Sequence, residues 1–198
     1  GKDGGRTVLI SGCIDTQKVH ISSAIASGYK YMLIVTSDEA KARKMCDDAS
    51  FFNKEAIYYP AKDAIFYSAD VHGNQITGER LRCISRIINH SSTGEGVLTV
   101  VTTMDGIADR LIPVERFKEA VITLDYSSEI EPEKLAKKLV AMGFVRTGMV
   151  EDKGQFAIRG GIIDIFSYTD EAPVRIELWD TEVDSIRMFD VESQRSIE

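Results

Sequence analysis

Cysteine, histidine, proline and tryptophan are all scarce in this chain of 198 residues. The three cysteines, Cys13, Cys46 and Cys83, lie far apart without a Cys-x-x-Cys pair, which disfavours a disulfide framework or a zinc site and favours thiols in a reducing compartment. The three histidines have no partner at the spacing of metal ligands. We therefore predict a cytoplasmic protein without a bound metal.

Long apolar runs are also missing. None approaches the roughly 20 residues that span a bilayer, and the chain begins without a signal-peptide pattern, so we expect no membrane partner. A hydrophobic content of 43% and a charged content of 28% are typical of globular proteins. Because the first residue is Gly1 rather than methionine, we expect a fragment of a longer polypeptide.

An excess of positive charge is lacking as well. Residues 1–117 contain 14 Lys and Arg against 14 Asp and Glu, whereas residues 118–198 contain 10 against 17. Proteins that bind nucleic acid directly normally present a basic surface to the phosphates. The composition thus disfavours DNA as a direct ligand of this part of the protein.

In the first block, short apolar runs alternate with helical patterns, which predicts a parallel sheet with helices on its faces. Thr36 and Glu39 have the spacing of a helix-capping box. We expect a loop over residues 61–76. Strands are expected at 7–10, 31–35, 56–59 and 97–101, and helices up to 26 and at 39–51, 77–89 and 103–111.

In the second block, one helix accompanies several strands, which predicts a small α+β domain with antiparallel strands. The helix is expected at 132–142, with Pro132 in its first turn. Strands are expected at 120–124, 144–147, 155–159, 162–166, 174–178 and 186–190. The predicted fold class is α/β, in two domains: a P-loop-type block over 1–117 and the α+β domain over 118–198.

The segment from Gly12 to Val19 lies where a phosphate-binding loop would lie, between a strand and a helix. Gly12 and Lys18 match the pattern G-x-x-x-x-G-K-[ST], but Gln17 replaces the second glycine and Val19 replaces the hydroxyl residue. Val19 has no oxygen to offer Mg²⁺, and the Cβ of Gln17 crowds the turn. We predict that this degenerate loop binds no nucleotide, so that the chain has no catalytic residue and no cofactor.

Arginines occur in the strands of the second block. Strand alternation places Arg175 and Glu177 on one face and Ile176 on the other. The same rule separates Arg159 from Phe156. If the strand of Arg146 is a neighbour, three guanidiniums and a carboxylate share one side of the sheet, which suits carboxylate pairing across an interface. A solvated face of alternating charges is the alternative. Asp164 lies in an apolar strand, and we expect it to pair with Arg159 or Arg175 or to cap a turn.

Residues 143–147, 154–166, 173–187, 189–190 and 194–196 together resemble the N-terminal UvrB-homology module of the bacterial transcription-repair coupling factors, the Mfd family. A weaker likeness extends back through residues 59–60, 78–81 and 97–113. UvrB resembles the second block too, but it has an intact Walker A loop and a long aromatic hairpin. Here the loop is degenerate and residues 61–76 form only a short connection.

The resemblance implies that the second block is the docking site for UvrA. Matched motif by motif, it assigns UvrA contacts to five residues of this chain: Arg146, Phe156, Arg159, Arg175 and Glu177. A further contact arginine of UvrB falls on Ala157 here, so that interaction is expected to be absent or replaced.

The resemblance also implies a non-catalytic module that recruits nucleotide excision repair to stalled RNA polymerase. In the full-length protein, a helicase superfamily 2 motor in another domain would use ATP and Mg to translocate on double-stranded DNA. Two alternatives remain open: a fragment of a UvrB-type ATPase that handles damaged DNA, and an intramolecular packing module whose arginine-bearing face is masked by the C-terminal region of its own chain.

Overall fold

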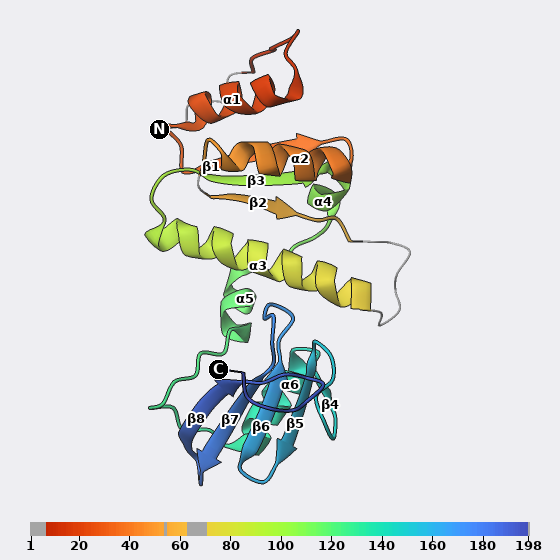
Figure 1. Ribbon diagram of the computed structural model, residues 1–198. Coiled ribbons are helices and arrows are strands. Elements are labelled where there is room, and N and C mark those ends of the chain that lie inside the picture. The colour runs from red at the N-terminus through yellow and green to blue at the C-terminus, as the bar shows by residue number, and fades with distance from the viewer. Residues whose placement is uncertain (1–6, 54, 63–70, 198) are drawn as a thin grey trace. The chain divides into compact units, whose positions relative to one another are not determined.

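A computed structural model describes residues 7–53, 55–62 and 71–197 of the chain (Figure 1). The chain divides into two compact units. The first comprises residues 1–61 and 85–109, and the second comprises 62–84 and 110–198. Helix α3 (Val71–Thr93) contributes residues to both units. The domain border that we predicted after Phe117 falls inside helix α5 (Val114–Ala120), and its position stays a prediction.

The first unit is built on a parallel sheet of three strands, β1 (Tyr31–Thr36), β2 (Ala56–Tyr59) and β3 (Leu98–Thr103). The strand order is β1-β3-β2, and both pairings are parallel. Central strand β3 is buried at most positions, as expected for a strand with helices and neighbouring strands around it. This arrangement confirms the α/β class predicted for the first block.

Helices α1 (Asp15–Ala26) and α2 (Glu39–Ser50) form two layers beside this sheet (Figure 1). A short helix, α4 (Met104–Ala108), follows β3 directly. The core of the unit joins α1, α2 and β3 through five buried side chains: Val19, Ala42, Met45, Ala49 and Val101.

Three predictions for the first block are wrong. Residues 7–10 form no strand, and Leu9 is almost fully exposed, because no described strand offers them a partner. The N-cap of α2 is Asp38 rather than Thr36: its carboxylate accepts a hydrogen bond of 2.8 Å from the N–H of Lys41, while Thr36 ends β1. The loop predicted over 61–76 lies partly outside the described residues, and from Val71 onwards the chain is helical.

The second unit contains a sheet of five strands in the order β4-β5-β6-β7-β8. The β4–β5 pair is parallel and the other three pairs are antiparallel, which confirms the predicted α+β character apart from the first pair. The strands are β4 (Val145–Arg146), β5 (Gln155–Arg159), β6 (Ile162–Phe166), β7 (Val174–Trp179) and β8 (Glu182–Met188).

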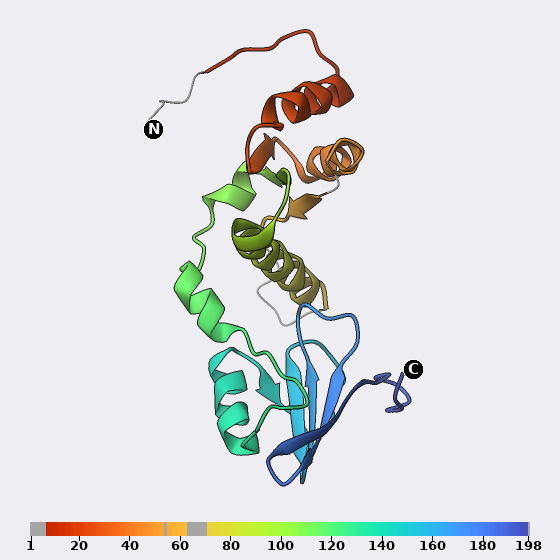
Figure 2. The same ribbon diagram turned by 90° about the vertical axis from the view of Figure 1, so that its left-hand side faces the viewer.

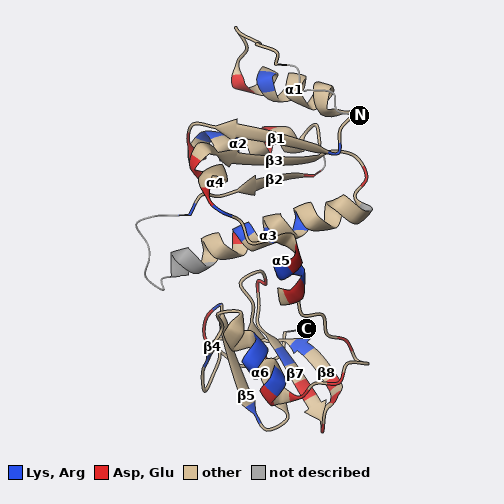
Figure 3. Ribbon diagram, turned by 180° about the vertical axis from the view of Figure 1, so that it is seen from behind, with Lys and Arg blue, Asp and Glu red and all other residues tan. Residues whose placement is uncertain are grey.

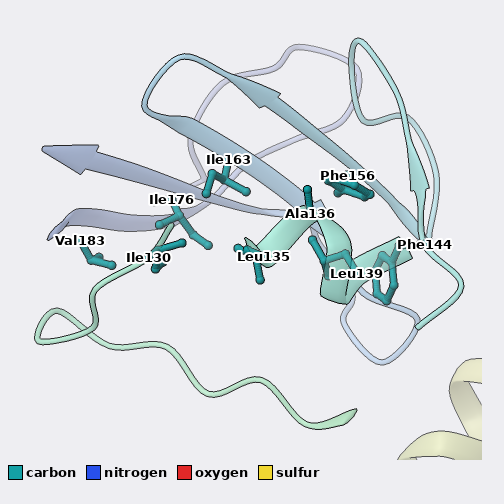
Figure 4. Close-up of a cluster of buried hydrophobic side chains, with 9 residues drawn as sticks. All are labelled: Ile130, Leu135, Ala136, Leu139, Phe144, Phe156, Ile163, Ile176 and Val183. Carbon is teal, nitrogen blue, oxygen red and sulfur yellow. The ribbon is translucent and has the colours of Figure 1, made fainter. Parts of the chain in front are cut away.

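Helix α6 (Pro132–Ala141) covers one face of this sheet, and the segment that follows β8 runs along the other side (Figure 2). The core between α6 and the sheet contains nine buried side chains, shown in Figure 4: Ile130, Leu135, Ala136, Leu139, Phe144, Phe156, Ile163, Ile176 and Val183. Their burial fixes which face of each strand points inward, because side chains alternate along a strand.

The strand predicted at residues 120–124 is also wrong. Helix α5 ends at Ala120, and residues 121–125 pair with no strand of the sheet. Val121 is exposed, whereas Ile122 and Leu124 pack against the core. The alternation in the sequence therefore arises from a connecting segment that lies along the edge of the core, rather than from a strand of the sheet.

Candidate protein-interaction face

The sheet of the second unit has a charged face opposite α6. Asp164 is the cross-strand partner of Arg175, and Arg175 is the partner of Arg187, so these side chains lie on one side. Arg159 and Glu177 each lie two residues along their strand from this cross-strand row. Because side chains alternate, both point to the same side of the sheet as the row does. We call the surface formed by Arg159, Asp164, Arg175, Glu177 and Arg187 the arginine face. Figure 3 marks basic and acidic positions close together on β7 and β8.

Asp164 lies at the centre of the arginine face and is fully buried. Its Oδ1 accepts a hydrogen bond of 2.7 Å from Nε of Arg175, and its Oδ2 accepts one of 2.9 Å from Nη2 of the same guanidinium. Nη2 of Arg159 donates to Oδ2 as well, at 2.5 Å. A buried carboxylate requires such partners. The prediction that Asp164 pairs with an arginine is confirmed, and it pairs with both.

Arg175 is held on several sides. Besides Asp164, its guanidinium donates to the main-chain oxygen of Gln194 at 3.2 Å and lies 4.5 Å from the centre of the Phe189 ring. The hydrogen bond to Asp164 raises the pKa of Arg175 above its ordinary value. Because only 16% of its side chain is exposed, Arg175 supports the face more than it projects from it.

Arg159 differs from Arg175 in its exposure. Its side chain is 46% exposed, and among the described residues its guanidinium makes one hydrogen bond, to Asp164. A guanidinium has five N–H donors, so most of them remain available to a partner. The buried carboxylate thus restrains the group while leaving its outer edge open, an arrangement that suits bidentate binding of a second carboxylate.

Glu177 holds a further arginine, which the sequence analysis missed. Nη2 of Arg187 donates to Oε1 of Glu177, and the hydroxyl of Ser185 donates to Oε2 at 3.1 Å. The side chain of Arg187 is 47% exposed. We had expected the last strand at residues 186–190, whereas β8 begins at Glu182 and pairs Arg187 with Arg175. Because Ile186 packs against the core, alternation within the expected strand already places Arg187 on the opposite side, on this face.

Arg146 is not part of the arginine face, which corrects the prediction that three guanidiniums share one side. Because β4 runs parallel to β5, Arg146 aligns with the inward-facing Phe156. Its guanidinium lies 3.4 Å from a carboxylate oxygen of Glu133 in α6. Arg146 is therefore on the helix side of the sheet, at the edge strand.

Phe156 also lies on the helix side. Its side chain is fully buried in the core against α6 and has no surface with which to touch a partner. Its location on the face opposite Arg159 agrees with strand alternation, but the contact role that the resemblance implies does not fit this structure. Phe156 instead packs in the core between β5 and α6.

The residues of the degenerate loop in the first unit make contacts within the chain. The side-chain oxygen of Gln17 accepts a hydrogen bond of 3.2 Å from the N–H of Ile14, at the start of α1. Nζ of Lys18 lies 2.9 Å from Asp15, and Val19 is fully buried in the core. Gly12 has a φ of +79°, so the main chain turns sharply just before these contacts.

No group of three or more histidine, cysteine, aspartate or glutamate side chains is placed to hold a metal ion in the part of the chain that the structure describes. Among the same residues, no helix combines the length and the apolar character needed to cross a bilayer.

Residues 122–198 match the family model of the UvrB interaction domain. The described core of the second unit and the arginine face lie within the matched residues.

Nearly the whole chain is similar to one segment of the transcription-repair-coupling factors. It is 37% identical over 199 residues to the transcription-repair-coupling factor of Bacillus subtilis, a match that covers 99% of this chain. It is 36% identical to those of Staphylococcus aureus and Staphylococcus haemolyticus, over 98% of this chain. The chain spans 16% of the length of each of these relatives. The resemblance inferred from its motifs is therefore confirmed.

Proposed function

We propose that the arginine face docks UvrA, and that the chain is a non-catalytic recruiting module of a transcription-repair coupling factor. The match of residues 122–198 to the family model of the UvrB interaction domain supports a role in binding a repair protein. The observation that carries the proposal is Arg159, half exposed above a fully buried carboxylate. A restrained guanidinium of this kind loses little side-chain entropy when a partner carboxylate binds.

Within this proposal the five residues implied by the resemblance have different roles. Arg159 makes the direct contact with an acidic side chain of UvrA. Arg175 and Glu177 act mainly by holding neighbouring groups in place, because each is already engaged within the sheet. Arg146, at the β4 edge, contributes a smaller peripheral contact, and Phe156 contributes only to stability.

The remaining steps belong to other parts of a longer protein. We propose that a motor elsewhere in that protein binds ATP and Mg, translocates on double-stranded DNA and acts on stalled RNA polymerase, while this module brings in the excision machinery. The chain itself is proposed to bind no nucleotide, which is supported by the engagement of Lys18 with Asp15 and the burial of Val19. A cytoplasmic location fits this role and stays a prediction.

Calorimetric titration of purified UvrA with the chain, with and without ATP, tests the proposal. Arg159→Ala should weaken binding by about 2–5 kcal/mol, the cost of removing one partner from a desolvated charge pair. Arg43→Ala is a suitable control, because Arg43 is also an exposed arginine in an ion pair but lies in the first unit. Wild-type chain that does not bind UvrA, or an Arg159 variant with unchanged affinity, would contradict the proposal.

A further inference from the structure

Trp179 is the only tryptophan of the chain and is 79% exposed. It is the last residue of β7, two positions beyond Glu177, so alternation along β7 places both side chains on the same side of the sheet. The pairing with β8 shifts register between Glu177 and Leu178, but Leu178 still pairs with the inward-facing Val183. The intervening Leu178 packs against the core on the helix side, which agrees with this orientation. The indole therefore lies on the arginine face, at the tip of the β7–β8 hairpin. Covering an indole removes a large apolar area from water.

Arg187 repeats, on the same hairpin, the arrangement of Arg159. In both cases a carboxylate of the sheet holds the guanidinium, and about half of the arginine side chain stays exposed. The carboxylate of Glu177 is itself fixed by Ser185. Both arginines thus present oriented donors to a partner without first losing much side-chain freedom.

The spacing of these two arginines defines the partner that they fit. Arg159 lies on β5 and Arg187 on β8, with two strands between them and a shift of one cross-strand row. From ordinary strand spacings, their backbone positions are about 15 Å apart. A partner surface with two carboxylates separated by a similar distance can reach both guanidiniums at once.

Charges at the hairpin tip restrict how such a partner binds. Asp180, Glu182 and Asp184 are exposed around Trp179. Carboxylates of the partner are repelled there and attracted to Arg159 and Arg187, so an apolar side chain is the favoured neighbour of the indole. The face therefore selects one orientation of the partner.

We propose that Trp179 and Arg187 are two further contact points of the docking surface, at separate positions along the β7–β8 hairpin. Trp179 receives an apolar side chain of UvrA, and Arg187 receives an acidic one. This inference rests on the proposed docking of UvrA to the arginine face. It adds two hairpin residues that the resemblance does not assign. Trp179 supplies the apolar area, and Arg187 supplies the charge-assisted hydrogen bonds.

The affinity of UvrA for Trp179→Ala and Arg187→Ala tests the inference, with Arg159→Ala measured in parallel. We expect each hairpin variant to weaken binding about tenfold or more, the effect of truncating an interface hot spot. Trp179→Phe, which keeps an aromatic ring, should lose no more than about threefold. Circular dichroism and thermal unfolding of each variant separate lost binding from lost folding, since both side chains are exposed and their removal should leave the fold intact.

A second measurement observes the indole directly. The chain labelled with 5-fluorotryptophan gives one ¹⁹F resonance, because it contains one tryptophan. Unlabelled UvrA should shift that resonance and remove its sensitivity to exchange of H₂O for D₂O. If Arg159→Ala weakens binding while both hairpin variants bind normally and the resonance stays solvent-sensitive, the inference is wrong and the docking proposal stands. If the wild-type chain binds no UvrA, the docking proposal fails as well.

Discussion

Lys18 in the first unit and Arg159 in the second are equally exposed, and each is paired with one aspartate. The two aspartates differ, because the side chain of Asp15 is 36% exposed whereas Asp164 is fully buried. An exposed pair on one helix is weakened by water and salt and leaves both side chains mobile. A buried carboxylate that serves two arginines fixes their positions. Burial of the acidic partner is thus what distinguishes a surface charge from an organised binding group.

Removal of the buried carboxylate should have the largest effect. Asp164→Ala leaves Arg175, mostly covered, without its charge partner, and should lower the free energy of unfolding by about 3–5 kcal/mol. Urea unfolding followed by circular dichroism measures this loss. Asp15→Ala is the matched variant in the first unit and should change stability by no more than about 0.5 kcal/mol. Equal losses in the two variants would show that burial does not separate the two pairs.

Restoring the missing hydroxyl residue of the degenerate loop should destabilise the first unit. Val19→Thr restores a phosphate-loop residue but places a hydroxyl in an apolar core, which should cost about 1–3 kcal/mol of stability. Thermal or urea unfolding checks this value. Val8→Thr makes the same chemical change at an exposed position and should be nearly neutral. Should Val19→Thr prove as harmless as Val8→Thr, the loop has kept room for its original function.

The helices of the two units should respond differently to loss of the residue that precedes them. Asp38 caps α2 through its carboxylate, whereas Glu131 before α6 makes no side-chain cap. Asp38→Ala should therefore cost about 0.5–2 kcal/mol, while Glu131→Ala should remain within about 0.5 kcal/mol of wild type. Chemical denaturation of both variants makes the comparison, and a larger loss for Glu131→Ala would reverse it.

The smallest expected effect is that of salt on the pKa values of two exposed aspartates. A hydrogen bond from Lys18 lowers the pKa of Asp15, and hydrogen bonds from Ser193 lower the pKa of Asp190. Each lowered pKa stabilises the fold above the unfolded value of about 3.9, and this contribution is lost as pH falls through the folded value. About 1 M salt should raise the pKa of Asp15 more than that of Asp190, because only Asp15 depends on a charged partner. Carboxyl NMR titrations of both residues would reveal an equal response if this reasoning is wrong.

Sequence patterns correctly predicted those strands whose apolar residues are also the ones that pack in the folded chain. Strand β1 is a continuous apolar run, and β7 alternates cleanly, so both were placed correctly and the faces of Arg175 and Ile176 followed. Residues 7–10 and 120–124 carry equally apolar patterns but lack a pairing partner in the described structure. Propensity alone cannot show whether a neighbouring strand is present.

Strand register decided on which side of the sheet Arg146 lies, and the sequence alone could not show this. Whether Arg146 lies above or below the sheet depends on the alignment of β4 with β5, and one residue of slip reverses it. Arg187 could have been placed on the face from the sequence, because alternation next to the inward-facing Ile186 points it outward. Asp164 was easier to interpret, since a carboxylate in an apolar strand requires a cationic partner.

Side-by-side titration of UvrA with Arg159→Ala and Arg146→Ala tests the docking surface most directly. The two arginines are equally exposed, but only Arg159 lies on the arginine face above a buried carboxylate. We predict that Arg159→Ala weakens binding about 30-fold or more, while Arg146→Ala causes a clearly smaller loss. Equal losses, or a greater loss for Arg146→Ala, would contradict the claim that UvrA binds the face opposite α6.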